Sequence, residues 1–120
     1  MNRFCINTLT HGSKNRVQLL NKTIDLFVEH TDFEDLHWFI YINGSDGQFD
    51  GIESELIRKY PDITWSITHS NVNSGVGAGI NKLNEQSKDY EYTLFLEGDW
   101  FTVPEKLSHI GKNWLNTCIE

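Results

Sequence analysis

The sequence predicts an α/β protein of three layers, with helices on both faces of a mainly parallel β-sheet. Four short apolar runs rich in β-branched and aromatic residues alternate with three stretches whose apolar residues recur at helical spacing. Repeated strand–helix–strand units imply right-handed crossovers, which place successive strands parallel. At 120 residues, the chain is expected to form one domain over residues 1–120.

The first half of the chain is expected to hold two strands and the start of a second helix. Phe4 to Leu9 is a short apolar run, as in a buried strand, and apolar residues at helical spacing predict an amphipathic helix over residues 15–30. HWFIYI, residues 37–42, is apolar enough to be covered on both faces, and the turn sequence NGSDG ends it. Asp50 followed by Glu53 matches a capping box that opens the second helix.

The second half continues the alternation. Residues 64–68 alternate between apolar and polar side chains and predict a third strand. Asn73 or Ser74 is expected to cap a third helix that runs to about Ser87, and residues 92–96 form the fourth strand. The apolar residues expected on the inner face of this helix are Val76, Ile80 and Leu83.

Composition excludes some partners and leaves others. Ten basic and 17 acidic residues give a net charge of -7, which disfavours nucleic-acid polymers and anionic membranes. No apolar stretch approaches the ~20 residues of a membrane span. Cys5 is expected as a buried thiol, and the lack of a paired cysteine framework favours a reducing, cytoplasmic setting. A small phosphorylated ligand remains possible, because backbone amides or a metal can neutralise it locally.

The ends of the four strands carry most of the unusual polar residues, and in parallel sheets these ends meet at one edge where ligands bind. Glu97, Gly98 and Asp99 follow the last strand, so two carboxylates flank a residue without a side chain. Such a pair suits Mg²⁺ or Mn²⁺, which prefer oxygen ligands and also hold phosphate oxygens. The same triplet also fits a solvated turn.

The glycine-rich stretch over residues 73–81 has two interpretations. It contains GxGxG and follows the third strand, so the dinucleotide fingerprint GxGxxG after a first strand is not met. Gly79 is expected to permit close packing of helix on sheet, whereas Gly75, nearer the edge, would admit a nucleotide or sugar. The five histidines lack the spacing of a zinc site, and His11 and His69 are expected as surface residues.

Four segments taken together resemble the family 2 glycosyltransferases of the GT-A fold. They are INTLTHGSKNR, with Arg16 at the family's arginine, FIYINGSDG, NVNSGVGAGIN and YTLFLEGD. Residues 104–107, PEKL, are similar to a Pro-Asp-x-Leu that follows in the family, and EGD is similar to the family's DxD motif.

The resemblance implies a nucleotide-sugar site and a metal. Asp99 would hold Mn²⁺ or Mg²⁺, with Glu97 facing the ribose or serving as a second metal ligand. Asn43 stands where the family often has an aspartate that reads uracil, and Thr8 and Thr10 would border base and ribose. The full set implied for the site is Thr8, Thr10, Asn43, Ser45, Gly75, Asn81, Glu97, Gly98 and Asp99.

The function implied is the metal-assisted transfer of a sugar from a nucleoside-diphosphate sugar to a hydroxyl of a saccharide or other acceptor. Among such donors, a UDP-sugar is expected before the others. The resemblance covers the family's N-terminal, nucleotide-sugar-binding half, so the chain is expected to be truncated relative to the family, and no catalytic base is identified. The alternative is a non-catalytic nucleotide-sugar-binding or assembly module. A further enzyme class, the sugar-phosphate nucleotidyltransferases, is expected to have a glycine-rich, basic loop after the first strand, and TLTHGSKNR matches such a loop poorly. An open sheet edge predicts a homo-oligomer.

Overall fold

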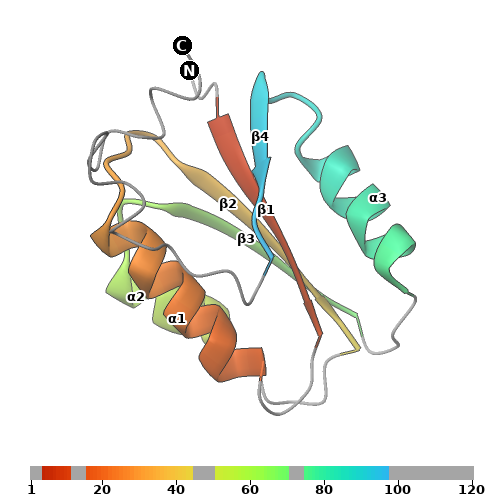
Figure 1. Ribbon diagram of the computed structural model, residues 1–120, viewed down its shortest axis with the longest axis horizontal. Helices are drawn as coiled ribbons and strands as arrows, with labels where there is room; N and C mark the ends of the chain where they lie inside the picture. The colour runs from red at the N-terminus through yellow and green to blue at the C-terminus, as the bar shows by residue number, and fades with distance from the viewer. Residues whose placement is uncertain (1–3, 12–15, 45–50, 71–74, 98–120) are drawn as a thin grey trace.

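A computed structural model of the chain describes residues 4–11, 16–44, 51–70 and 75–97, and these residues form a four-stranded parallel sheet with three helices (Figure 1). The sheet order is β3-β2-β1-β4. This confirms the predicted α/β class, and each element lies within a few residues of its predicted range. The elements are β1 (Phe4–His11), α1 (Arg16–Glu29), β2 (His37–Asn43), α2 (Ile52–Lys59), β3 (Thr64–Ser70), α3 (Val76–Gln86) and β4 (Tyr92–Phe95).

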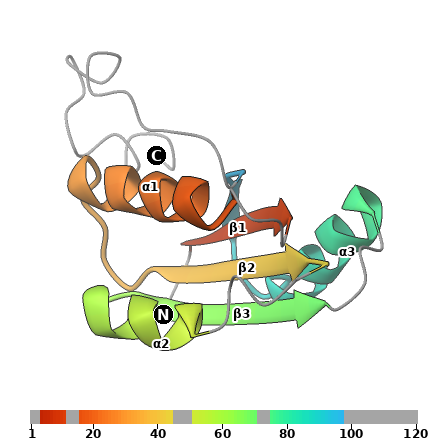
Figure 2. The same ribbon diagram turned by 90° about the horizontal axis from the view of Figure 1, so that it is seen from below.

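The helices form two layers, one on each face of the sheet. Figures 1 and 2 show α1 and α2 together on one face and α3 on the other. The larger core cluster, under α1 and α2, includes Ile24, Trp38 and Leu56, and the smaller one, under α3, is built on Cys5, Phe39 and Leu83. Because β2 contributes to both clusters, the prediction that it is covered on both faces is confirmed.

Trp38 organises the larger core cluster. Its ring stacks on Trp65 with centroids 5.4 Å apart and meets Phe27 edge-on at 5.2 Å. Its indole Nε1 donates a 2.9 Å hydrogen bond to Oγ1 of Thr8, so the polar atom of this fully buried side chain is satisfied. The bond ties β1 to β2 on the face covered by α1 and α2.

The predicted helix caps are wrong. The residue at the N-cap of α2 is Gly51 and the one at the N-cap of α3 is Gly75, and among the described residues neither helix start has a side-chain capping hydrogen bond. Gly51 has a φ of 79° and Gly75 has φ 92° and ψ 164°, a region that essentially only glycine adopts. The chain therefore enters both helices through a glycine at the N-cap position, and the predicted capping residues Asp50, Asn73 and Ser74 lie outside the described ranges.

The predicted packing roles of Gly79 and Cys5 are confirmed. A Cβ built on Gly79 would lie 2.6 Å from Cδ1 of Leu9, so the glycine allows α3 to approach β1 closely. Cys5 is fully buried, and burial raises the pKa of its thiol. Within the described residues, no helix combines the length and apolar content that a membrane span requires.

Candidate functional site

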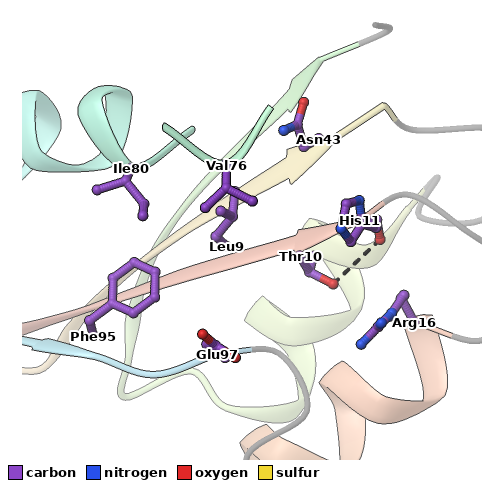
Figure 3. Close-up of a pocket in the computed structure, with 9 residues that line it drawn as sticks. All are labelled: Leu9, Thr10, His11, Arg16, Asn43, Val76, Ile80, Phe95 and Glu97. Carbon is purple, nitrogen blue, oxygen red and sulfur yellow. Dashed lines mark hydrogen bonds between the residues drawn. The ribbon is translucent and has the colours of Figure 1, made fainter. Parts of the chain in front are cut away.

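A pocket of about 200 Å³ opens at the carboxyl ends of β1, β2 and β4, against the first turns of α3 (Figure 3). This is the edge at which parallel α/β sheets place their ligands. The residues that line it are Leu9, Thr10, His11, Arg16, Asn43, Val76, Ile80, Phe95 and Glu97.

Sheet register brings the strand ends together. His11, the last residue of β1, lies opposite Asn43, the last residue of β2. On the other side of β1, Asn7 lies opposite Phe95, and the amide of Leu96 donates a 2.9 Å hydrogen bond to the carbonyl of Asn7. This bond continues the pairing past the end of β4, so the chain delivers Glu97 to the pocket.

Asn43 joins the end of β2 to the beginning of α3. Its side chain is 2% exposed, and its Nδ2 donates a 3.0 Å hydrogen bond to the carbonyl of Gly75. The same carbonyl accepts the amide of Gly79 at 3.3 Å, which is the first turn of α3. A buried amide therefore holds the start of the helix, and with it Val76, over the strand ends.

The pocket has an apolar part and a polar part. We call the four apolar side chains Leu9, Val76, Ile80 and Phe95 the apolar wall. The polar part lies along the strand ends and the start of α1, and its members are Thr10, His11, Arg16, Asn43 and Glu97. It contains one guanidinium and one carboxylate, so it offers both a donor fork and an oxygen ligand to a bound molecule.

The structure brings three of the predicted site residues together in this pocket: Thr10, Asn43 and Glu97. Gly75 lies at its border, where it accepts the hydrogen bond from Asn43 without lining the pocket itself. Asn81 is exposed on α3 and does not line the pocket. The predicted site residues Ser45, Gly98 and Asp99 lie outside the described residues.

Thr8 lies apart from the pocket. Its side chain is fully buried, and its hydroxyl accepts the indole N–H of Trp38 in the larger core cluster. Thr10, two residues further along β1, is 4% exposed and does line the pocket, where its Oγ1 lies 3.4 Å from the carbonyl of His11.

Sequence reasoning missed the apolar wall. Val76 was expected to face inward with Leu83, but Val76 is 56% exposed whereas Leu83 is fully buried. His11 is exposed as expected, yet it lines the pocket at the end of β1. The available signal was the pair of glycines at positions 75 and 79, which bring the first turn of α3 close to the sheet.

The residues present offer part of a site for a hard divalent cation. Glu97 is exposed at the pocket, and its carboxylate is the kind of ligand that Mg²⁺ and Mn²⁺ prefer. Among the described residues, there is no cluster of three or more His, Cys, Asp or Glu side chains that would hold a metal by itself. A metal at this edge would therefore need a further ligand, and Asp99 is the predicted one.

The chain matches no protein-family model and no curated protein sequence. Solved structures do match it. A crystal structure of S. aureus TarS 1-349 in complex with UDP aligns over 99% of this chain with a TM-score of 0.70 and 16% identity. Another structure of TarS gives the same TM-score, identity and coverage of this chain.

The fold is GT-A-like. A third structure, of TarS 1-349, aligns over 90% of the chain with a TM-score of 0.62 and 17% identity. The chain spans 31% of TarS 1-349 in the UDP complex and 19% of the longer TarS chain. At this identity the likeness establishes the α/β fold alone, and the activity is a separate question.

Proposed function

We propose that the pocket binds the nucleotide of a nucleoside-diphosphate sugar, with a UDP-sugar favoured, and that the chain is the donor-binding part of a family 2 glycosyltransferase. One observation carries the proposal: the pocket lies at the carboxyl ends of β1, β2 and β4 of a fold similar to that of TarS, which was crystallised with UDP. Each of the four sequence segments that resemble family 2 enzymes contributes at least one residue to this pocket, among them Arg16, Asn43, Val76 and Glu97.

The pocket residues have chemistry that suits a nucleotide. The guanidinium of Arg16 can donate two parallel hydrogen bonds to phosphate oxygens, the geometry for which arginine is suited. The Thr10 hydroxyl and the Asn43 amide offer donors and acceptors for ribose and base. We assign the ligand contact in β1 to Thr10 and a packing role to Thr8, whose hydroxyl is already occupied by Trp38.

We further propose that Asp99 and Glu97 hold Mn²⁺ or Mg²⁺ at the diphosphate, with Asp99 as the principal ligand. When bound, such a metal supplies Lewis-acid assistance to the departing nucleoside diphosphate. The residues of this chain bind and orient the donor, so that the hydroxyl of an acceptor can attack the anomeric carbon as its proton passes to a carboxylate base. No described residue is assigned as that base.

Calorimetric titration with UDP, with and without Mn²⁺, tests the proposal. We expect saturable UDP binding that is tighter with Mn²⁺. Asp99→Asn should abolish the effect of Mn²⁺, and Glu97→Gln should weaken binding less, because it keeps the principal metal ligand. Asp89→Asn is the matched control. Asp89 is an exposed aspartate shortly before the first residue of β4, at the end of the strand away from the pocket. A folded wild-type chain that shows no saturable UDP binding in either condition would overturn the proposal.

The same samples distinguish donor binding from sugar transfer. UDP released from a UDP-sugar in the presence of Mn²⁺ and a hydroxyl acceptor, measured over time, reports transferase or hydrolase activity. A chain that binds UDP and the UDP-sugar but releases no UDP is a nucleotide-sugar-binding module.

A further inference from the structure

We propose that the apolar wall receives the nucleobase, with Val76 in contact with a face of the ring, and that the phosphates lie in the polar part beside Arg16 and Glu97. This inference rests on the proposed nucleotide function and deepens it: it gives the ligand an orientation and identifies Val76 as a residue for base binding. Figure 3 shows Val76 and Ile80 on α3 projecting toward Leu9, with Phe95 beside them and Glu97 and Arg16 further along the strand ends.

The exposure of Val76 is the first observation. Among the described residues, three large hydrophobic side chains are exposed: Ile57, Val76 and Tyr92. Ile57 lies on α2 and Tyr92 at the start of β4, and neither lines the pocket. Of the three, Val76 is the one that lines the pocket, together with the partly exposed Leu9, Ile80 and Phe95, so a flat apolar ligand placed there would remove a continuous apolar surface from water.

Val76 is also held in place before any ligand arrives. It is the first residue of α3 and follows Gly75, whose carbonyl accepts the hydrogen bond from the buried Asn43 amide. One turn later, Gly79 rests against Leu9 and Tyr41 of the sheet. A preorganised apolar side chain contributes more to affinity, because less conformational entropy is lost on binding.

The chemistry of the ligand gives the orientation. A nucleobase has two apolar faces, whereas ribose and phosphate carry hydroxyls and charges that lose hydrogen bonds against an apolar surface. The apolar wall therefore fits the base, and the guanidinium and hydroxyl of the polar part fit phosphate and ribose. A pocket of about 200 Å³ is smaller than the 300–1,000 Å³ typical of ligand sites, so it is sized for part of a nucleotide sugar.

Three substitutions at Val76 and one control test the inference by titration with UDP and UMP, and with pyrophosphate measured by displacement of UDP. Val76→Thr keeps the branched shape but replaces a methyl group by a hydroxyl, Val76→Ala removes apolar area, and Val76→Ile keeps the apolar contact. The control is Ile57→Thr, which makes a similar change at a side chain that is 50% exposed, against 56% for Val76.

We expect Val76→Thr and Val76→Ala each to weaken the binding of UDP and of UMP by the same factor. That factor should be roughly three- to tenfold, for part of one buried side chain. Pyrophosphate affinity should stay unchanged in both. Val76→Ile, which keeps the apolar contact, should bind UDP more tightly than Val76→Ala does, and the control Ile57→Thr should bind UDP like the wild type. Urea unfolding of each variant confirms that it folds.

The outcomes separate the two proposals. If wild-type protein fails to bind UDP, the proposed function is wrong. If the wild type binds UDP but Val76→Thr and Val76→Ala leave UDP affinity unchanged, or weaken pyrophosphate equally, only the assignment of the apolar wall to the base is wrong.

Discussion

The contact between α3 and the sheet can be tested with two glycines of the same helix. A Cβ on Gly79 would lie 2.6 Å from Cδ1 of Leu9 and 3.4 Å from Cδ1 of Tyr41, whereas a Cβ on Gly77 would meet nothing within 4 Å. Gly79→Ala must therefore move the terminal methyl groups of Leu9, a residue that also lines the pocket. Gly77→Ala places a methyl group in open space.

The magnitudes follow from two opposing terms. Replacing glycine by alanine within a helix stabilises it by about 0.8–1 kcal/mol, and this gain applies to both variants. Overpacking typically costs about 1–3 kcal/mol and applies only at Gly79, where the lower end of this range is expected because the atom met is a terminal methyl of the flexible Leu9 side chain. We therefore expect Gly77→Ala to raise the free energy of unfolding by up to about 1 kcal/mol, and the free energy of unfolding of Gly79→Ala to lie about 1 kcal/mol below that of Gly77→Ala.

Urea unfolding followed by tryptophan fluorescence measures both free energies, and a UDP titration of the same variants reports the pocket. Gly79→Ala should also weaken UDP binding, because the displaced Leu9 belongs to the apolar wall. Gly77→Ala should be at least as stable as the wild type and should bind UDP at least as tightly. Equal or greater stability of Gly79→Ala relative to Gly77→Ala would refute the close packing of α3 on β1.

Three further predictions concern single side chains. Thr8→Val should lower the free energy of unfolding by about 1–3 kcal/mol, because it leaves a buried indole N–H unsatisfied, and should leave UDP affinity intact. Thr10→Val should weaken UDP binding and leave the free energy of unfolding intact. Urea unfolding and UDP titration measure both quantities, and exchanged effects would contradict the assignment. Asn43→Ala should weaken UDP and reduce discrimination among UDP, GDP and CDP, because the start of α3 loses its hydrogen bond; unchanged titrations with all three would refute this. Burial lowers the pKa of His37 from its ordinary 6.5, so its contribution to stability is complete above that pH and is lost as the pH falls through the folded-state pKa. In His37→Gln, the midpoint of urea unfolding should fall less steeply as the pH is lowered than in the wild type. An unaltered pH dependence of the midpoint would show that His37 is not the source of the decline.

The elements of the fold were predictable because their patterns report burial directly. HWFIYI has no polar face, and β2 does contribute side chains to both core clusters. The helix caps were not predictable from residue type, because the glycine conformations at positions 51 and 75 depend on how the preceding chain approaches each helix. The order β3-β2-β1-β4 likewise depends on long-range pairing that local patterns do not encode.

The candidate site was predictable in its location and less so in its members. Strand ends gave Thr10, Asn43 and Glu97, which the structure brings to one pocket. Thr8 and Thr10 lie on the same strand two residues apart, and only the position of Trp38 in the next strand separates their roles. Val76 looked like a core residue because helical spacing does not show where the sheet beneath a helix ends. The metal role of Asp99 remains a prediction.

The most direct test of the central claim maps the UDP site residue by residue in solution. Amide chemical shifts of the ¹⁵N-labelled chain are followed during titration with UDP and Mg²⁺, which is diamagnetic and leaves the signals visible. The account predicts that the largest changes cluster on the residues at and beside the pocket, at Thr10, Asn43, Gly75, Val76 and Glu97, while His37 and Tyr90 at the opposite end of the sheet stay unchanged. Saturating UDP that moves no signal of the pocket, or that moves chiefly the His37 and Tyr90 end, would contradict it.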